Sequence, residues 1–428
     1  MTDARRLAFE VSMRVQEGAR SDAELGAALA RSKLSVEDRA LATRLVYGVE
    51  AWRRRLDHTI AAYADRRIDR IDAEARVALR LGAYQLLLLD RVPDYAAVDS
   101  SVRLLSGNAR RATGFVNAIL RRIGRDGEAP PPRDEYDALS VSLSHPPWLV
   151  RLWRTELGTE KAVELMRANN ESAPTTLRCF VDRDEAIAAL AQDGCRAAPA
   201  RFAPDALTCD RGTALRGIAV PQGEASQLVA LFVGAAAGER VLDACAAPGG
   251  KTAYLAARVG PRGEVTAVDP GRLAARRIEA LLELCGERVR VVNERVQDLV
   301  PELAYDAVLV DAPCSGLGTL REHPEIRWRR EEADLDGYAA RQREILTAAA
   351  RHVRPGGRVV YATCTLARSE NDDVADRFLA DHDEFRPDTT GGLHASVVPF
   401  VDKSCRLRTS PHEHGLSGFF AARFVRVT

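Results

Sequence analysis

Apolar residues in the first part of the chain recur every three or four positions. The repeat is clearest over residues 7–15, 40–49, 56–63 and 75–89, and this period puts the apolar side chains on one face of an α-helix. A run of prolines from Pro130 to Pro132 cannot continue such a helix. The pattern therefore predicts an all-α domain over residues 1–128, followed by a linker over 129–140.

The pattern changes further along the chain. Residues 141–218 are interpreted as a small α+β segment, with helices from residue 147 and over 161–169 and 185–192, and a strand over 175–182. Over 219–428, short buried strands alternate with helices. The strands are predicted over 241–245, 264–269, 289–293, 306–311, 358–363 and 418–427, and the helices over 251–259, 272–284, 338–353 and 371–381. This alternation indicates a mainly parallel, doubly wound α/β sheet.

Composition narrows the class of protein. The 428 residues are 46% hydrophobic and 29% charged with zero net charge, as in an ordinary globular protein of more than one domain. Neither an apolar run long enough to span a membrane nor a secretory signal is found in the sequence. The eight cysteines include no C-x-x-C pair, which argues against zinc and against a disulfide framework. We expect a cytoplasmic monomer without a metal ion or a membrane contact.

Positive charge is concentrated in one stretch of the predicted helical domain. Residues 101–125 contain six arginines and neither Asp nor Glu; the arginines are Arg103, Arg110, Arg111, Arg121, Arg122 and Arg125. Such a run fits a solvated helix face and a nucleic-acid contact equally well.

Two cysteines stand at the ends of predicted strands. Cys314 follows the strand over 306–311, and Cys364 follows the strand over 358–363. The carboxyl ends of parallel strands meet at one edge of a sheet, where ligands of open α/β sheets bind. We therefore expect both thiols in one crevice. This arrangement favours covalent catalysis over the usual fate of a lone cysteine, which is burial in a core.

A third strand end carries a glycine-rich turn. Gly249 and Gly250 follow the strand over 241–245, and glycine lets a ligand approach the backbone closely. The dinucleotide motif G-x-G-x-x-G is absent, and a P-loop would need a glycine where Cys245 stands. The remaining candidate is S-adenosyl-L-methionine. Asp269 is then placed for the ribose hydroxyls and Asp298 for the adenine amine, although Asp298 could equally be a surface carboxylate.

With these motifs the chain closely resembles the RNA cytosine-5 methyltransferases of the Sun/Fmu class. The matching stretches are 220–226, 245–252, 311–318, 321–328, 361–366, 370–371, 414–415 and 418–420. The N-terminal part resembles a NusB-like RNA-binding domain over 81–87, 90–93 and 114–122. The pairing points to bacterial enzymes that act on 16S rRNA. Gly223 and Ser417 depart from the family pattern, which leaves local substrate contacts open.

The resemblance implies a fold and a set of site residues. The fold is an all-α NusB-like domain, a small α+β segment, and a Rossmann-like class I methyltransferase domain over 219–428. Cys364 would be the nucleophile, Cys314 would assist breakdown of the adduct, and Asp311 would bind the cytosine N3/N4 edge or the cofactor. Lys251, which follows the glycine-rich turn, would either face the active site or lie on the surface at the start of the next helix. The residues implied to bind S-adenosyl-L-methionine are Cys245, Ala246, Ala247, Pro248, Gly249, Gly250, Lys251, Asp269, Asp298 and Asp311.

Further basic residues follow Cys314 in the sequence. Arg327, Arg329 and Arg330 could contact phosphates, and Trp328 is either a base-stacking platform or part of a core. The expected partner is 16S rRNA. A cytosine-5 methyltransferase of tRNA, another RNA or DNA and a non-enzymatic NusB-type RNA-binding factor remain as alternatives.

Overall fold

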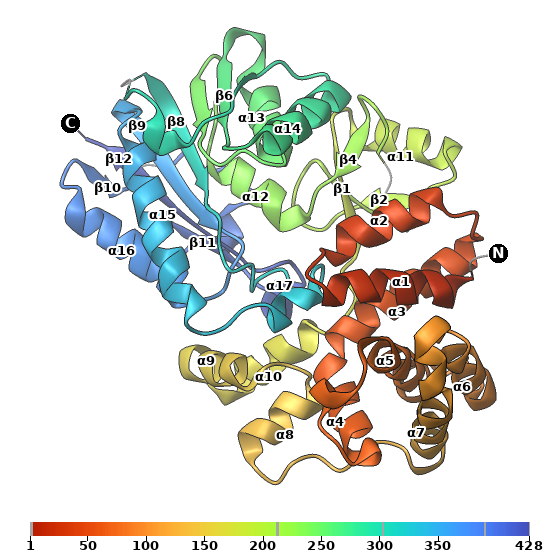
Figure 1. Cartoon of the computed structure of the whole chain (residues 1–428). Coiled ribbons are helices and arrows are strands. Elements are labelled where there is room, and N and C mark those ends of the chain that lie inside the picture. Colours follow the sequence, from red (N-terminus) through yellow and green to blue (C-terminus); the bar gives the residue numbers. More distant parts are fainter. Residues whose placement is uncertain (1–2, 211–213, 302–303, 389–390, 428) are drawn as a thin grey trace. The chain divides into compact units, whose positions relative to one another are not determined.

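The computed structural model describes residues 3–210, 214–301, 304–388 and 391–427 (Figure 1). The chain folds into two compact units. The helical unit contains Met1–Ser172 and Leu320–Arg330, and the sheet unit contains Ala173–Thr319 and Glu331–Thr428. The boundaries of the domains and of the linker, which were predicted from the sequence, remain predictions. The helical unit as folded continues beyond residue 128, and it takes in a segment that lies far away in the sequence.

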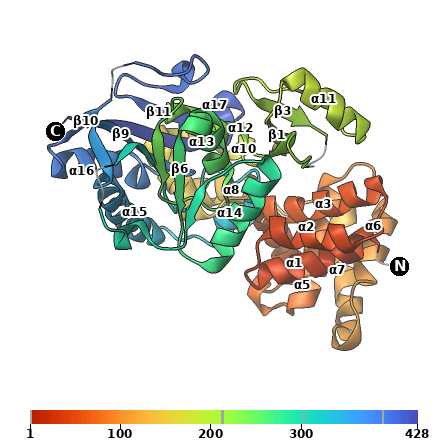
Figure 2. The ribbon, with the colours of Figure 1, turned by 90° about the horizontal axis from the view of Figure 1, so that it is seen from above.

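The first part of the helical unit is a bundle of α-helices around one apolar core (Figure 2). Its elements are α1 (Ala4–Gln16), α2 (Ser21–Arg31), α3 (Val36–Ala51), α4 (Arg53–Ala64), α5 (Ala73–Leu88), α6 (Asp94–Val102) and α7 (Thr113–Asp126), with the 3₁₀ turns η1 (Ile68–Arg70) and η2 (Gly107–Ala112). The predicted all-α character is confirmed. The apolar repeat did not predict α2, because only Ser21 and Leu25 of that helix are buried.

Polar side chains define where these helices begin. Asp3 accepts a hydrogen bond from the backbone N–H of Arg6 at 2.7 Å and so caps α1, and Ser35 caps α3 in the same way. Helix α7 ends at Asp126, before the prolines. The rest of the helical unit consists of α8 (Glu135–Ser142), α9 (Pro147–Leu157), α10 (Thr159–Ala168) and η5 (Pro324–Trp328).

The sheet unit begins with a small antiparallel sheet in the order β2-β3-β1-β4. Its elements are β1 (Thr175–Cys179), α11 (Arg183–Gln192), β2 (Ala197–Pro199), β3 (Ala206–Cys209) and β4 (Ala219–Pro221). Leu177 of β1 packs with Leu190 of α11 in its core. Strand β1 and helix α11 follow the sequence prediction. The other strands are only three or four residues long, too short for a pattern of alternating burial to identify them.

The main sheet has the order β10-β12-β9-β8-β5-β6-β7, and β11 pairs with β12. The strands are β5 (Arg240–Asp243), β6 (Glu264–Val268), β7 (Arg290–Val292), β8 (Tyr305–Asp311), β9 (Val353–Thr363), β10 (Phe385–Pro387), β11 (Arg406–Thr409) and β12 (Phe419–Arg426). Pairing is parallel from β9 to β7 and antiparallel from β12 outward. This confirms the predicted Rossmann-like fold class.

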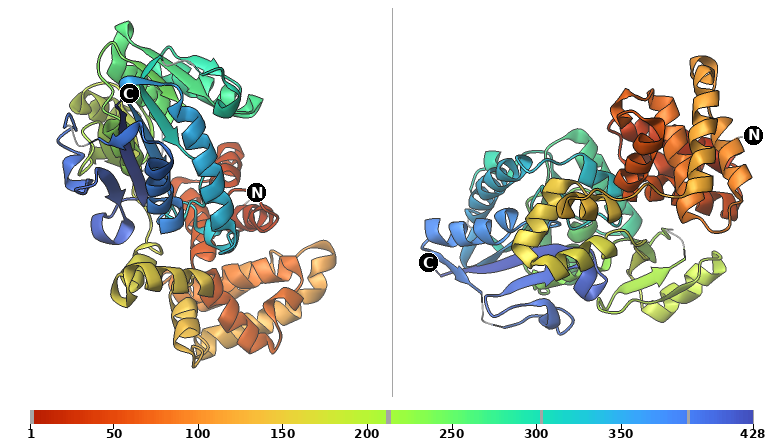
Figure 3. Two further views of the ribbon diagram at one scale, coloured as in Figure 1. Left: turned by 90° about the vertical axis from the view of Figure 1, so that its left-hand side faces the viewer. Right: turned by 90° about the horizontal axis from the view of Figure 1, so that it is seen from below.

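Helices cover both faces of this sheet (Figure 3). Val360 and Ala362 of β9 share a core with α12 (Glu224–Phe232) and α13 (Gly250–Val259). Val359 and Tyr361 share the opposite core with α15 (Asp334–Ala350) and α16 (Asp372–Asp381). The remaining elements are α14 (Arg272–Cys285), α17 (Pro411–His414), η3 (Gly260–Arg262), η4 (Val296–Asp298), η6 (Arg368–Glu370) and η7 (Val398–Phe400). A strand that is buried on both faces has an almost continuous apolar sequence, as β9 does from Val359 to Ala362.

The order of the strands places the ligand-binding edge. Strand β5 lies between β6 and β8, so the chain runs outward through β6 and β7 and then returns to the other side of β5. This reversal is a topological switch point, and ligands of such sheets bind at the carboxyl ends of the strands beside it. Among the described residues, no helix is long and apolar enough to cross a membrane.

Candidate active site

Two thiols meet at this edge of the sheet. Strands β8 and β9 are parallel neighbours in which Asp311 pairs with Ala362, and each strand runs directly into a cysteine loop. The Sγ atoms of Cys314 and Cys364 lie 3.2 Å apart, and the backbone N–H of Cys364 donates to the Cys314 sulfur at 3.3 Å. The parallel register therefore brings together two side chains that are fifty residues apart in the sequence.

The environment of Cys314 favours its protonated form. The pKa of the Cys314 thiol is raised well above its ordinary value, first because it hydrogen-bonds to the Cys364 sulfur and then because it is buried. The N–H of Cys364 acts in the opposite direction but is the weaker influence. Cys314 is thus held as a protonated thiol, and either sulfur can be the donor in the hydrogen bond between them.

A lysine and an aspartate lie beside the thiols. Lys251 Nζ donates to Asp311 Oδ2 at 2.7 Å, and the ammonium also lies 5.1 Å from the ring centre of Phe419. Burial disfavours the charged lysine, but the Asp311 carboxylate outweighs burial and raises the pKa of Lys251. A negative charge on Cys364 adds to the same effect. Lys251 therefore faces the site and is not a surface residue at the start of α13.

A buried carboxylate holds the two cysteine loops. Glu370 is fully buried and accepts hydrogen bonds from the backbone N–H of Ser315 at 2.9 Å and from Gln342 Nε2 at 2.9 Å. Gln342 also donates to the carbonyl of Pro313. The hydroxyls of Ser315 and Thr365 join the two loops at 2.8 Å. Glu370 and Gln342 are therefore positioning residues; the sequence placed Glu370 in a family-matching stretch without giving it a role, and it did not point to Gln342.

Two glycines allow the loops to approach each other closely. Gly318 N–H donates to the carbonyl of Cys364 at 3.0 Å, and its own carbonyl accepts from Gly418 N–H at 2.7 Å. A Cβ at Gly318 would lie 1.9 Å from the Gly418 carbonyl oxygen, which no side chain can tolerate. Glycine at this position is therefore required by the packing of the two loops.

The glycine-rich turn connects β5 to α13. Gly249 has φ +108° and comes directly before α13, a conformation that favours glycine. The carboxylate of Asp269, at the end of β6, accepts from the backbone N–H of Ala247 at 3.0 Å. Burial raises the pKa of Asp269, and this hydrogen bond opposes the rise. Cys245 lies in the same turn, and burial raises the pKa of its thiol well above the ordinary value.

Asp243, the last residue of β5, was not assigned a role from the sequence. It is buried and accepts a hydrogen bond from Thr252 Oγ1 at 2.7 Å, while its Oδ1 atom is buried without a hydrogen-bond partner. Burial raises the pKa of Asp243 to about 7. An open acceptor beside a turn without side chains at Gly249 and Gly250 fits a ligand that carries hydrogen-bond donors. The residues present therefore suit S-adenosylmethionine.

The structure does not gather every predicted residue at this edge. Asp298 lies in η4, is exposed, and forms a bidentate ion pair with Arg295, which lowers its pKa. Arg327 folds with the helical unit and is fully buried there, so the expectation that it contacts RNA phosphates is wrong. Trp328 is half-buried, and its indole N–H donates to the carbonyl of Glu50 at 2.7 Å.

Comparison with known proteins assigns the chain to a family. Three family models match: "16S rRNA methyltransferase RsmB/F" over residues 230–425, "NusB family" over 2–125, and "Methyltr_RsmF/B-like, ferredoxin-like domain" over 145–216. Probable ribosomal RNA small subunit methyltransferase B of Bacillus subtilis is 32% identical, over 98% of this chain and 98% of its own. Ribosomal RNA small subunit methyltransferase B of Thermus thermophilus is 35% identical, over 99% and 98%.

Two solved structures are similar in fold to this chain. The crystal structure of PH0851 covers 99% of this chain and 98% of its own, with a TM-score of 0.85 and 24% identity. NSun6 from Pyrococcus horikoshii with SFG covers 66% of this chain and 98% of its own, with a TM-score of 0.56 and 19% identity.

The sheet, the turn and the site together define an S-adenosylmethionine-dependent methyltransferase. More narrowly, this chain belongs to the RsmB/F family of 16S rRNA methyltransferases and carries the NusB-family domain at its N-terminus.

Proposed function

We propose that this enzyme methylates C5 of a cytosine in 16S rRNA through a covalent bond between Cys364 and C6 of the base. The observation that carries the proposal is the pair of sulfurs 3.2 Å apart at the edge where the Lys251–Asp311 pair also lies. Two thiols at a methyl-transfer site suit a reaction in which a covalent bond must first form and then break. Bound S-adenosylmethionine supplies the electrophilic methyl group.

Cytosine C5 is a poor nucleophile, and a thiolate can activate it. The Cys364 sulfur donates an electron pair to C6, and the π electrons of the C5–C6 bond move to C5. C5 would use that pair to take the methyl group, while the bond between the methyl carbon and the cofactor sulfur breaks and S-adenosylhomocysteine leaves. The C5 proton is then lost to water, the C5–C6 double bond forms again, and the C6–S bond breaks to return the Cys364 thiolate.

The charges around the two sulfurs support Cys364 as the attacking group. The pKa of the Cys314 thiol is raised well above its ordinary value, which makes Cys314 a poor attacking group. With its sulfur 3.2 Å from that of Cys364, Cys314 would instead act as the hydrogen-bond donor to an attacking sulfur. The same hydrogen bond would stabilise the Cys364 thiolate as it leaves C6. We therefore assign Cys314 to breakdown of the adduct.

Asp311 would bind the base or the cofactor, and Lys251 would provide a positive charge in the site. One oxygen of Asp311 accepts from Lys251, and the other could accept from the cytosine N4 amine or hold the cofactor. The Asp311 carboxylate raises the pKa of Lys251 and so keeps the ammonium charged. Their pairing would fix the orientation of the base over the thiols.

The turn between β5 and α13 is proposed to bind the cofactor, together with the acids that follow β6 and β7. Asp269 would accept from the ribose hydroxyls with the oxygen that Ala247 does not use. Asp298 would reach the adenine amine only if it leaves Arg295, which now occupies both of its oxygens. The turn itself would contribute Cys245, Ala246, Ala247, Pro248, Gly249, Gly250 and Lys251.

The substrate proposal follows from the family and its relatives, which are named for the small ribosomal subunit. The helical domain over 1–128 would contribute to rRNA binding. Its arginines from Arg103 to Arg125 are exposed and available to phosphates. We further propose that the enzyme works as a monomer in the cytoplasm, where ribosomal subunits are assembled.

Mapping the product tests this proposal. 16S rRNA from cells that lack the gene would be incubated with the purified enzyme and S-adenosylmethionine, digested to nucleosides and analysed by mass spectrometry, with bisulfite sequencing to locate the site. We expect 5-methylcytidine at one position with wild-type enzyme and none with Cys364→Ala. A methyl group on another atom, or equal yield from Cys364→Ala, would contradict the proposal.

A further inference from the structure

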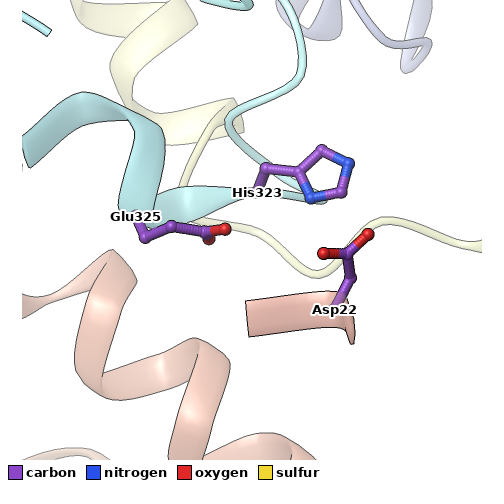
Figure 4. A group of neighbouring side chains, drawn as sticks. All are labelled: Asp22, His323 and Glu325. Carbon is purple, nitrogen blue, oxygen red and sulfur yellow. The ribbon is translucent and has the colours of Figure 1, made fainter. Parts of the chain in front are cut away.

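Reactive side chains lie close together in each unit of the structure. In the helical unit, Figure 4 shows His323 grouped with Asp22 and Glu325, and their ligand-type atoms all lie within 4.8 Å of one another. Both carboxylates already have partners in this unit. Asp22 pairs with Arg20 at 2.8 Å, and Glu325 accepts hydrogen bonds from the backbone N–H and the hydroxyl of Ser21. These contacts account for both acids without a bound ion.

In the sheet unit, the reactive groups are the thiols of Cys314 and Cys364. Their sulfurs lie 3.2 Å apart, whereas the two sulfurs of a disulfide are about 2.05 Å apart. A bond between them would therefore require the sulfurs to approach by only about 1 Å. Rotation of the two side chains about their Cα–Cβ bonds can supply this movement, so the pair can be cross-linked without a change of fold.

The backbone around the two cysteines also suits a disulfide. Strands β8 and β9 are parallel neighbours as far as the pair of Asp311 and Ala362. Neighbouring strands lie about 4.8 Å apart, and the Cα atoms of a disulfide are usually about 4.4–6.8 Å apart. Beyond the cysteines, the hydroxyls of Ser315 and Thr365 join the two loops at 2.8 Å. The loops are thus held together both before and after the two thiols.

A small oxidant can reach this pair. Both cysteine side chains are only half-buried, whereas Cys179 and Cys285 are buried and their pKa values are raised to about 11 by burial. The thiolate is the form that reacts with a peroxide, and the raised pKa of Cys314 makes that thiol slow to react. Cys364 would therefore be oxidised first, with the Cys314 sulfur beside it to react with the product.

We propose that Cys314 and Cys364 form an oxidation site: hydrogen peroxide joins them in a disulfide, which stops methyl transfer until a dithiol reduces it. The Cys364 thiolate first attacks the peroxide. The O–O bond breaks, an S–O bond forms, and hydroxide leaves. The Cys314 sulfur then attacks this sulfenic acid. The S–S bond forms, the S–O bond breaks, and the hydroxyl group leaves with the Cys314 proton as water. The two sulfurs together lose the two electrons that the peroxide gains.

The disulfide would protect the site while it stops the reaction. A sulfenic acid without a neighbouring thiol is oxidised further to a sulfinic acid, which thiols do not reduce. Because Cys314 lies next to Cys364, oxidation would end at a product that a dithiol can reverse. Formation of the disulfide depends on the geometry of the pair alone, whereas the loss of activity rests on the proposed function through the role of Cys364.

The test follows the disulfide and the activity in the same samples. Reduced full-length enzyme would be treated with hydrogen peroxide, quenched with catalase, alkylated, digested with trypsin and analysed by mass spectrometry. Transfer of labelled methyl from S-adenosylmethionine to 16S rRNA would be measured before and after dithiothreitol. We expect linked peptides that contain Cys314 and Cys364. The fraction of activity lost should equal the fraction of enzyme linked, and dithiothreitol should restore it.

Three variants distinguish this pair from the other cysteines. Cys405→Ser removes a half-buried thiol just before β11 and should form the disulfide as readily as wild type. Cys314→Ala should accumulate sulfinic acid on Cys364, which dithiothreitol does not reverse. Cys364→Ala should keep Cys314 as a thiol at the peroxide concentration that links wild type, since burial still disfavours the Cys314 thiolate and raises its pKa.

Sulfinic acid on Cys364 of wild type without the linked peptides would overturn the inference, as would a link from either cysteine to any other. Linked enzyme that still transfers methyl groups at the wild-type rate would overturn both the switch and the proposed role of Cys364. If wild type makes 5-methylcytidine, Cys364→Ala does not, and no disulfide forms, the switch alone is wrong. The two failures are therefore distinguishable.

Discussion

At the scale of single residues, the site depends on charges that stabilise each other. Lys251 stays protonated although it is buried, because Asp311 lies 2.7 Å away. Cys314 stays protonated because it is buried and bonded to Cys364. A charged lysine and a neutral thiol are thus kept side by side in one small group of side chains. Because Asp311 and Cys364 both raise the pKa of Lys251, a substitution at either position would also change the charge of Lys251 and should be interpreted as a change to the group.

Asp269 offers a cleaner test, because it lies outside that group. Asp269→Ala should weaken S-adenosylmethionine binding about tenfold to a hundredfold, since a hydrogen bond to a charged group is worth roughly 1.5–3 kcal/mol. Isothermal titration calorimetry would measure the affinity for S-adenosylmethionine. The affinity for rRNA is the control and should not change. Asp298→Ala measured in parallel should give a smaller effect, because Asp298 is exposed and paired with Arg295. Equal cofactor affinity in wild type and Asp269→Ala would place the ribose elsewhere.

At the scale of elements, the turn from β5 to α13 should make stability depend on pH. The pKa of Asp243 is raised to about 7 by burial, against about 3.9 in an unfolded chain. The folded state therefore binds the extra proton between these values, and its contribution to stability is lost as the pH rises through about 7. Asp243→Asn should remove this dependence, since an amide oxygen can still accept from Thr252.

The measurement is thermal unfolding without cofactor from pH 4 to pH 9. Relative to wild type, Asp243→Asn should gain stability toward pH 8, and the difference should shrink toward pH 4. A constant difference across the range would show that Asp243 does not titrate in this window.

The same scale shows what the sequence could and could not predict. Cys314, Cys364 and the turn at Gly249 were predicted to meet because each ends a strand of one parallel sheet, and strand ends can be recognised from apolar runs. Glu370 and Gln342 were missed because their roles depend on packing between η6, α15 and two loops. Arg327 was misjudged for the same reason. A run of arginines resembles a phosphate-binding surface, and its burial depends on α3 and α10, which are distant in the sequence.

At the scale of the whole molecule, RNA binding should depend on salt through the six arginines from Arg103 to Arg125. Four of the six arginines, Arg103, Arg111, Arg122 and Arg125, form ion pairs with neighbouring carboxylates. Exposed pairs of this kind are weak, so they can be exchanged for phosphate contacts. Each contact that is used should steepen the dependence of log K on log salt, by about 0.7 of a unit on single strands and by nearly one unit on a double helix with the charge density of B-DNA.

Arg110→Ala/Arg121→Ala should therefore weaken 16S rRNA binding and flatten its salt dependence, as measured by filter binding at several salt concentrations. Arg31→Met, which removes an exposed arginine of α2, serves as the matched control. If the double variant binds 16S rRNA with the same affinity and the same salt dependence as wild type, these arginines form only a solvated face. Deleting residues 1–128 is a less informative test, because it also removes Ala51 and Glu50, whose carbonyls accept from Arg327 and Trp328.

The most direct test of the account is to trap the covalent intermediate. Wild type, Cys314→Ala, Cys364→Ala and the double variant would be incubated with labelled rRNA and S-adenosylmethionine and resolved on a denaturing gel. The account predicts a stable protein–RNA band from Cys314→Ala only, and mass spectrometry of that band should place the bond on Cys364. A band from Cys364→Ala but none from Cys314→Ala would reverse the roles of the two thiols, and no band from either would contradict the covalent mechanism.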